Sequence, residues 1–255
     1  MDLVLGTLLV LVVVSFWFAR KPTGKLRVLM YHKIDPTRQD MLTVSTSQLE
    51  QHLLYLQNEG FVFLPLQNLL HLSSPPANGI ILTFDDAYLN NLTYAYPILK
   101  KYNTCATIFV PTAYVNGTNA WDLQPEPLLS LEQLRQLDSE IFSLGLHSHR
   151  HQHYGKLSVE EISNDLTQNI AFFHQNNLEF IPAFAYPYGG RPKSKIIKKQ
   201  MQQQMKHLGI EMAFRIGNRL NAWPLRNRYE IQRIDIRGTD SFEDFKRKVR
   251  WGKLI

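Results

Sequence analysis

Short apolar runs alternate with amphipathic stretches along most of the 255-residue chain. Apolar runs of about four to eight residues, bounded by turn residues, are typical of strands buried in a parallel sheet. The runs predict strands at 26–32, 61–66, 79–84, 106–112, 141–146, 182–189, 212–217 and 230–236. Amphipathic stretches predict helices between them, at 47–59, 88–102, 158–176 and 193–207, with further helices opening near 130 and near 240.

Four of these helices carry a capping pattern at their expected start. A Ser, Thr or Asp followed three residues later by Glu or Gln can satisfy the free backbone donors of a first helical turn. The pattern occurs as Ser47–Glu50, Ser130–Gln133, Ser158–Glu161 and Asp240–Glu243. We therefore expect helices to begin at these four positions.

Strands that alternate with helices predict an α/β fold with a parallel sheet. Seven or eight strand candidates over about 230 residues fit a (β/α)7-8 barrel, distorted or incomplete, better than a small doubly wound sheet. The composition, 44% hydrophobic and 20% charged, is ordinary for a globular protein. No internal repeat or second domain is evident, so we expect one domain over 26–255.

The amino terminus differs from the rest. Residues 3–19 form an uncharged apolar run of about 17 residues, near the short limit for a membrane-spanning helix. A secretory signal would need a basic start and a small-x-small cleavage site, and both are missing. We expect 1–25 to be a retained single-pass anchor with a short linker. Arg20, Lys21, Lys25 and Arg27 follow the run, and the positive-inside rule favours a domain that faces the cytoplasm.

Charge and cysteine content narrow the function classes. The net charge of +6 comes without a recognisable nucleic-acid motif, so we expect no nucleic-acid partner. The single cysteine, Cys105, excludes an internal disulfide and a multi-cysteine metal site. Two basic stretches, 193–199 and 246–253, lie on expected helices and are either solvated faces or, for the last helix, a contact with anionic lipid. The apolar side for that contact would be Phe242, Phe245, Val249 and Trp251.

Candidate chemistry gathers where apolar runs end. Asp85 and Asp86 close the run at 79–86, GIILTFDD. One of them could cap a helix, but the second needs another explanation. His147, His149, His151 and His153 follow the next-but-one strand, and imidazole is a common metal ligand. Because the carboxyl ends of parallel strands share one rim in a barrel, both groups are expected in one site.

Two more segments end strands at the same rim. His32 is the last residue of the first run and could be a buried structural histidine or an acid–base group. The segment 185–190, AYPYGG, could be an ordinary aromatic turn, or a loop that brings the backbone N–H of Tyr188 close to a ligand.

With these four segments, the chain resembles a polysaccharide deacetylase of the NodB-homology type, carbohydrate esterase family 4. TFDD at 83–86 matches the first motif of that family, His147-Ser148-x-x-His151 the second, and AYPYG at 185–189 a variant of the third. The likeness runs from Leu26 to the carboxyl terminus. The LMYHKI and RIDIRG segments resemble the branch with the poly-N-acetylglucosamine deacetylases of biofilm systems.

The resemblance implies a metal site and a base. Asp86, His147 and His151 would bind a divalent metal, with zinc the expected ion, and Asp85 would be the catalytic base. Two neutral imidazoles and one carboxylate leave such an ion with net positive charge, which lowers the pKa of its water.

The resemblance also implies a general acid and a hydrogen-bond donor for the oxyanion. The late Leu-x-His motif that supplies the acid in most of the family is absent, because the last histidine is His207. In the biofilm branch the histidine after the first strand takes that role, and His32 matches it. The backbone N–H of Tyr188, after Pro187, would stabilise the oxyanion.

The chain departs from the family pattern in three places. Ala87 replaces the usual Gly after the aspartates, so the turn must avoid positive φ or accept strain. Phe184 stands near the place of an Arg that orients the base, and 215–223 shows no recognisable fourth motif. His149 and His153 have no matched role and are expected to line the loop.

The expected activity is hydrolysis of N-acetyl groups on amino sugars of a polysaccharide or a lipid-linked glycan. An O-acetyl esterase acting on a glycan has a closely similar mechanism and stays open. A non-catalytic carbohydrate-binding relative is a third interpretation. The missing Arg and fourth motif favour it, whereas the full set of Asp85, Asp86, His147 and His151 argues against it.

Overall fold

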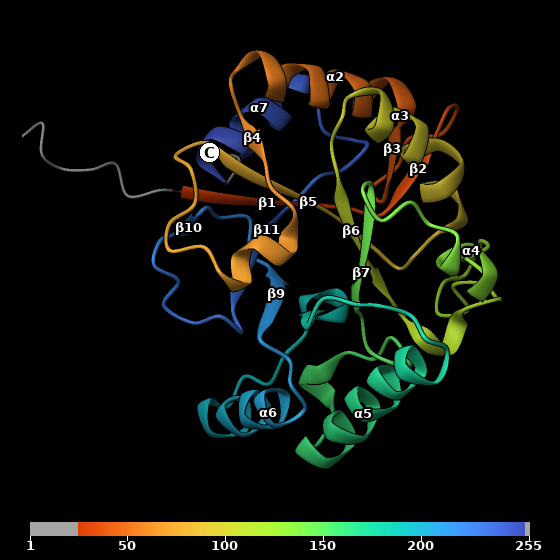
Figure 1. The fold of residues 1–255 in the computed structure, drawn as a ribbon, viewed down its shortest axis with the longest axis vertical. Coiled ribbons are helices and arrows are strands. Elements are labelled where there is room, and N and C mark those ends of the chain that lie inside the picture. Colours follow the sequence, from red (N-terminus) through yellow and green to blue (C-terminus); the bar gives the residue numbers. More distant parts are fainter. Residues whose placement is uncertain (1–24, 253–255) are drawn as a thin grey trace, which may run out of the picture.

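A computed structural model describes residues 25–252 as an α/β barrel (Figure 1). Seven parallel strands form a closed ring, because β1 pairs with both β5 and β11. In ring order they are β1 (Lys25–Tyr31), β5 (Gly79–Asp85), β6 (Ala106–Val110), β7 (Phe142–Leu146), β8 (Ala183–Ala185), β9 (Met212–Ile216) and β11 (Ile231–Asp235). The expected barrel is confirmed, with seven strands.

The ring is uneven. Strands β6 and β7 pair over five positions, whereas β7 and β8 share only the pair Leu146–Phe184. Two-residue strands, β4 (Val62–Phe63) and β10 (Asn221–Ala222), extend the sheet beside β5 and β1. A separate pair, β2 (Lys33–Asp35) and β3 (Thr43–Ser45), lies beyond the end of β1. The barrel is therefore distorted, as expected, and the distortion lies at the β7–β8 junction.

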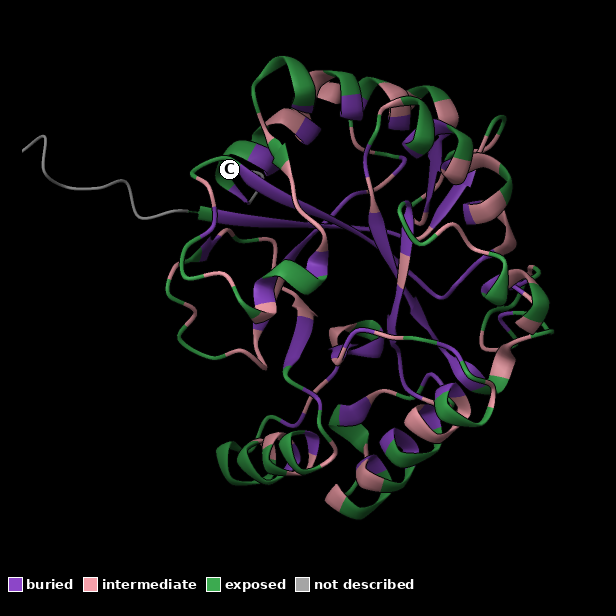
Figure 2. Cartoon of the chain, viewed as in Figure 1, coloured by how far each residue is buried: buried purple, intermediate pink, exposed green. Residues whose placement is uncertain are grey.

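Helices cover the outside of the barrel, and Figure 2 shows buried strands inside helices with exposed outer faces. They are α2 (Thr46–Asn58), α3 (Tyr96–Lys101), α4 (Leu131–Arg135), α5 (Val159–Gln175), α6 (Lys195–His207) and α7 (Phe242–Trp251). Shorter turns are η1 (Leu66–Leu70), η2 (Asn91–Ala95), η3 (Thr112–Tyr114), η4 (Tyr154–Lys156) and η5 (Pro187–Gly189).

The core has two parts because strands such as β5 are buried on both faces. All seven residues of β5 are buried. Ile80, Leu82 and Phe84 belong to the layer between the barrel and the helices. Ile81 belongs to the barrel interior, together with Phe109 and other residues. Because β5 is buried on both faces, its sequence is almost continuously apolar and does not alternate with polar residues.

Two of the four capping predictions are confirmed and two are wrong. Ser130 and Ser158 cap α4 and α5. The boxes of α2 and α7 are Ser45–Gln48 and Ser241–Asp244, in place of the pairs beginning at Ser47 and Asp240. Where two matches to the capping pattern overlap in the sequence, tertiary contacts decide which of them forms the cap. For α2, the Gln48 side chain also donates to the Gly238 carbonyl at 2.9 Å, which favours that box.

Several other strands and helices are shorter than expected, and proline explains two of them. The strand expected at 61–66 is limited to β4, because Pro65 leads into η1. The helix expected at 88–102 is split into the π-helical turn η2 and α3, whose first turn contains Pro97. Proline cannot donate a backbone hydrogen bond, so the regular ladder is interrupted there.

The two lipid predictions have different outcomes. The apolar run 3–19 lies outside the described residues. Between residues 25 and 252, none of the helices combines the length and apolar character needed to cross a bilayer. The side of α7 considered for lipid is instead part of the core, because Phe245 and Val249 are buried and Phe242 packs on Tyr55 of α2. We therefore correct that interpretation of α7.

The basic residues of α7 are also neutralised by neighbouring acids. The pairs are Lys246–Glu243, Arg247–Asp244, Lys248–Asp240 and Arg250–Glu59. Only Trp251 is a large exposed apolar residue on this helix, with 64% of its surface accessible.

Candidate active site and metal centre

The two aspartates lie where β5 ends and the chain turns. Asp85 is the last residue of the strand, and both carboxylates are buried. Asp86 and Ala87 have φ values of 74° and 57°. Of the two possibilities for Ala87, the turn therefore accepts strain, on the order of 1 kcal/mol for a left-handed alanine. This turn sends the two carboxylates to different partners.

Asp86 lies next to the other two predicted metal ligands, His147 and His151. One ligand atom from each of Asp86, His147 and His151 lies within 4.8 Å of the others, and all three residues are buried. Asp86 Oδ1 is 3.2 Å from His147 Nε2 and 3.1 Å from His151 Nε2. Two imidazole nitrogens and a carboxylate oxygen suit zinc and leave coordination positions open. The predicted residues therefore converge and fit a divalent metal.

The electrostatics of this group favour a cation. Burial acts to raise the pKa of the Asp86 carboxyl, but His151 and His147 beside it hold the pKa well below its usual range. Burial acts to lower the pKa of His147, yet Asp85 and Asp86 raise it above its ordinary value. Carboxylates that stabilise positive charge on an imidazole also stabilise a metal ion at the same place.

The histidine loop is held by α5. His147 Nδ1 donates to the Ala185 carbonyl at 2.8 Å, which directs Nε2 toward Asp86. The buried carboxylate of Asp165 accepts from the backbone N–H of His149 at 2.9 Å and of Arg150 at 3.0 Å. It also accepts from the Tyr154 hydroxyl at 2.7 Å.

Sequence reasoning missed Asp165. The signal was an acidic residue on the buried stripe of an amphipathic helix, between Ile162 and Asn169. Buried carboxylates require partners, and the loop that follows β7 supplies them here.

The other two histidines line the loop, as expected, and lie outside the metal group. His149 Nδ1 shares a hydrogen bond of 3.0 Å with Thr112 Oγ1. His153 Nδ1 accepts from the Gly155 N–H at 3.1 Å, and its ring fills the space beside Gly190. A Cβ on Gly190 would lie 2.5 Å from that ring, so the ring would have to shift to admit a side chain there.

Asp85 has a separate partner, Arg233 of β11. Its two oxygens accept from Arg233 Nη1 at 2.5 Å and Nη2 at 2.6 Å. Arg233 is fully buried, and its guanidinium lies over the Phe109 ring at 5.4 Å. Burial acts to raise the pKa of the Asp85 carboxyl, but Arg233 and His147 lower it to below its ordinary value. Asp85 is therefore held as a carboxylate.

Arg233 contacts Asp85, the residue that the missing Arg of the third motif was expected to orient. Sequence reasoning read it only as part of RIDIRG, although an Arg inside an apolar strand was a usable signal. The region of the unrecognised fourth motif supports it, because the N–H groups of Gly217 and Asn218 donate to the Arg233 carbonyl. The long-range pairing of β11 with β1 could not be read from local spacing.

His32 follows β1 directly and lies beside Asp85. Tyr31 pairs in register with Phe84, so the next residues of the two strands are His32 and Asp85. The His32 charge is one of the influences that lower the pKa of Asp85. Its Nδ1 is buried without a hydrogen-bond partner among residues 25–252. The structure thus brings His32 to the site, and its role as an acid stays a prediction.

Tyr188 lies in the turn η5, with φ 58° and ψ 12°. Its ring packs edge-on to His151 at a centroid distance of 4.8 Å and is 55% exposed. Pro187 before it is buried. The structure places both residues next to the metal group, and the oxyanion role of the Tyr188 N–H stays a prediction.

An open hollow of about 610 Å³ adjoins the metal group. It is lined by His151, Gln152, His153, Lys156, Leu157 and Tyr188. Trp121, which sequence reasoning also missed, stacks on His151 with ring centroids 4.0 Å apart. The site therefore combines a buried ligand group with aromatic side chains.

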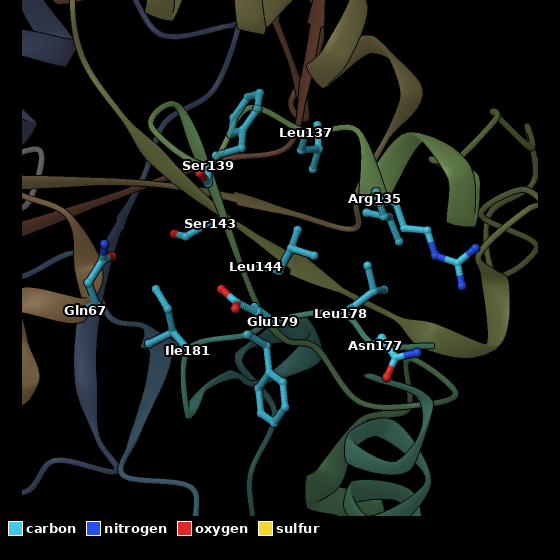
Figure 3. A pocket seen from close by; sticks show the side chains of 13 residues that line it. Gln67, Arg135, Leu137, Ser139, Ser143, Leu144, Asn177, Leu178, Glu179 and Ile181 are labelled. Carbon is cyan, nitrogen blue, oxygen red and sulfur yellow. The ribbon is translucent and has the colours of Figure 1, made fainter. Parts of the chain in front are cut away.

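A second hollow, of about 540 Å³, lies along β7 and before β8 (Figure 3). Its lining includes Ser143, Leu144 and Ile181 but contains no histidine or aspartate. It shares no residue with the metal group, which lies at the carboxyl ends of the strands.

Known proteins resemble this chain in sequence. A family model for polysaccharide deacetylase matches residues 73–213. The protein YxkH of Bacillus subtilis is 27% identical over 179 residues, 69% of this chain and 61% of that protein. A poly-beta-1,6-N-acetyl-D-glucosamine N-deacetylase of Staphylococcus aureus is 29% identical over 215 residues, 79% of this chain and 70% of that protein.

Solved structures share the fold at low sequence identity. The Streptococcus pyogenes deacetylase PplD, in complex with acetate, has a TM-score of 0.72 and 23% identity, over 89% of this chain and 99% of that one. IcaB from Ammonifex degensii has a TM-score of 0.73 and 20% identity, over 91% and 98%. These likenesses establish the NodB-type fold. Because the family model spans more than half of the sequence, the chain belongs to the polysaccharide deacetylase family.

Proposed function

We propose that this protein is a metal-dependent hydrolase that removes N-acetyl groups from amino sugars of a polysaccharide or a lipid-linked glycan. One observation carries the proposal. Asp85 and Asp86 are adjacent and buried, yet one pairs with Arg233 and the other with two histidines. Two carboxylates with different partners can take two different roles. The name of the Staphylococcus aureus relative supports an N-acetylated glucosamine polymer as the substrate class.

Asp86, His147 and His151 would hold the ion, which we propose to be zinc. A divalent metal bound there would act as a Lewis acid, lowering the pKa of a water molecule and polarising the acetamide oxygen. The three residues contribute one negative charge in total when both imidazoles are neutral. The His147–Ala185 hydrogen bond fixes the tautomer that leaves Nε2 free to bind.

Asp85 would accept the proton of the attacking water. Arg233 keeps it ionised and fixes both of its oxygens, so the carboxylate cannot rotate away from the water. The same pairing makes Asp85 a weaker base, which is adequate because the water itself would be acidified.

His32 would donate a proton to the leaving amine, and the backbone N–H of Tyr188 would donate to the oxyanion formed at the acetyl carbonyl oxygen. The register of β1 on β5 supports the first role, since it brings His32 next to Asp85. The position of Tyr188 against His151 supports the second. The exposed Tyr188 ring beside the hollow of about 610 Å³ also offers a face on which a sugar can stack.

We further propose that residues 3–19 anchor the protein in a membrane and that the domain faces the cytoplasm. The run of apolar residues and the Arg and Lys residues after it support this. Protease protection in intact cells tests the orientation. Digestion of the domain by external protease would place it on the other side.

The central experiment measures metal content and acetate release for the full-length chain, purified in mild detergent. N-acetylglucosamine oligomers are the substrate, and O-acetylated oligomers distinguish an esterase. We expect stoichiometric zinc, loss of turnover on chelation, and loss of turnover with retained zinc in Asp85→Asn. Glu211→Gln, which changes an exposed carboxylate before β9 to an amide, is the matched control and should leave both unchanged.

Two further results bear on the assignment. Acetate release that survives both metal removal and Asp85→Asn would refute the proposal. His32→Ala should lower turnover and leave the zinc content unchanged, whereas loss of zinc would make His32 a ligand.

A further inference from the structure

The two histidines of the metal group are held in different ways. A histidine that binds a metal usually donates its other ring N–H to a carboxylate, a carbonyl or a water molecule. His147 follows this rule through its bond to the Ala185 carbonyl. His151 does not, since its Nδ1 is buried and has no hydrogen-bond partner within residues 25–252. Another contact must orient this ring.

The contact is aromatic. The indole of Trp121 lies over the His151 ring with centroids 4.0 Å apart and planes 24° from parallel. Tyr188 meets the same imidazole at 4.8 Å and 62°. Tyr114 in turn packs against Trp121 at 4.8 Å and 80°. The imidazole of His151 therefore packs against two aromatic side chains, and one of these, Trp121, is supported by a third.

The backbone conformation of His151 is unfavourable by itself. Its φ is 50°, in the left-handed region that is unfavourable for a residue with a side chain. Such conformations persist where surrounding contacts determine them. The packing of the imidazole is one of those contacts.

Trp121 is itself firmly placed. Glu126, in the same loop, accepts from Lys33 Nζ and Arg38 Nη2, each at 2.7 Å. Asn119 donates to the Tyr88 hydroxyl at 3.1 Å and to Asp122 at 2.8 Å. These bonds tie the loop on both sides of Trp121 to the segments that follow β5 and His32.

We propose that Trp121 is a positioning residue for His151, and that its indole takes the place of the hydrogen bond that the second histidine lacks. This inference rests on the proposed metal site. An imidazole bound to a divalent ion carries partial positive charge, and the face of an indole attracts positive charge. Trp121 therefore stabilises the metal-bound state more than the metal-free state, and it raises metal affinity.

Zinc affinity of the full-length protein in detergent tests the inference, by competition with a chromophoric chelator. Trp121→Leu keeps apolar bulk without the aromatic face and should weaken zinc binding by about tenfold or more, the range for residues that orient a metal ligand. Trp121→Phe should recover most of the affinity. Trp251→Leu, at an exposed tryptophan of α7, is the matched control and should not differ from the parent. Cobalt(II) spectra should shift in Trp121→Leu alone.

The outcomes separate this inference from the proposed function. Zinc affinity of folded Trp121→Leu within about twofold of the parent, with an unchanged cobalt spectrum, would overturn the role of Trp121 and leave the metal site standing. A parent that binds no zinc would overturn both. If circular dichroism shows that Trp121→Leu does not fold, Tyr114→Leu replaces it. That variant removes the support of the indole and should weaken zinc binding severalfold, whereas unchanged affinity would overturn the inference.

Discussion

The carboxyl ends of β5 and β7 supply the site in contrasting ways. At the end of β5, two acids lie in consecutive positions, and the acid proposed as the base is held by a direct ion pair with Arg233. At the end of β7, two histidines lie four residues apart in a loop, and Asp165 holds that loop through its backbone N–H groups. Arg233 thus holds the side chain of the proposed base, whereas Asp165 holds the backbone of the loop that carries the proposed metal ligands.

The difference in support predicts a difference in response to mutation. Arg233 comes from a strand 148 residues away from Asp85, and its charge sets the ionisation of the base. Asp165 lies 16 residues from His149 and bonds to the loop without touching the metal group. Damage at Arg233 should therefore change turnover and its pH dependence, whereas damage at Asp165 should change stability and metal affinity.

The largest effect is expected from Arg233→Met. Removing one partner of a buried ion pair leaves Asp85 uncompensated, which should lower the free energy of unfolding by about 3–5 kcal/mol. Turnover should fall at least a hundredfold, because the base is no longer oriented. Denaturant unfolding and acetate release measure the two effects.

Two variants check that interpretation. Arg215→Met removes an arginine of β9 that pairs with Glu230 and should leave turnover unchanged. Adding Asp85→Asn to Arg233→Met should recover part of the lost stability, since no buried charge is then unpaired, without recovering activity. Equal stability of the single and double variants would show that the pair is not what Arg233 contributes.

A smaller and more specific effect is expected from Arg233→Lys. Lysine keeps the charge but cannot make the two-pronged contact, so it should offset the burial of Asp85 less well and the pKa of Asp85 should rise. The base is active when ionised, so activity is lost as the pH falls through this pKa. The acidic limb of the kcat/KM profile should therefore move to higher pH. If the acidic limb does not move, it reports the titration of another group. Arg215→Lys is the control.

Asp165→Asn tests the other support. An amide offers one acceptor and presents an NH2 group toward N–H donors, so the contacts to His149 and Arg150 cannot all persist. We expect a loss of about 1–3 kcal/mol in stability and about tenfold weaker zinc binding. Turnover at saturating zinc should stay near that of the parent, because Asp85 and Arg233 are unchanged.

The control for this variant is Asp244→Asn on α7, which also accepts a backbone N–H, that of Ser241. It should cost less than about 1 kcal/mol and leave zinc affinity unchanged. A lower turnover of zinc-saturated Asp165→Asn would show that Asp165 also supports turnover, which contradicts the proposed difference between the ends of β5 and β7.

Sequence reasoning reached the barrel and the residues that converge at the candidate site because both are local properties. Apolar runs and their acidic or histidine ends can be read within about ten residues. The parts that it missed, Arg233, Asp165 and Trp121, act across elements that are distant in the chain. For Arg233 and Asp165 the signal was a charged residue inside a strand or on a buried helix face, which indicates a partner but not which one. The misplaced start of α2 has the same origin, because a contact to Gly238 favours one of two overlapping patterns.

The smallest effect is expected from Ala87→Gly, which tests whether strain at the end of β5 is needed. Glycine should relieve about 1 kcal/mol of left-handed strain, while loss of the buried methyl group should cost about 0.8 kcal/mol. Because these two effects nearly cancel, the free energy of unfolding should change little. Asp86 should stay in the same place, so zinc affinity and turnover should stay close to those of the parent. Ala106→Gly, at a buried alanine of β6 outside the left-handed region, is the control and should lose about 1–2 kcal/mol. A marked loss of zinc affinity in Ala87→Gly would mean that the rigidity of this turn, like the packing around His151, is part of how the metal ligands are held.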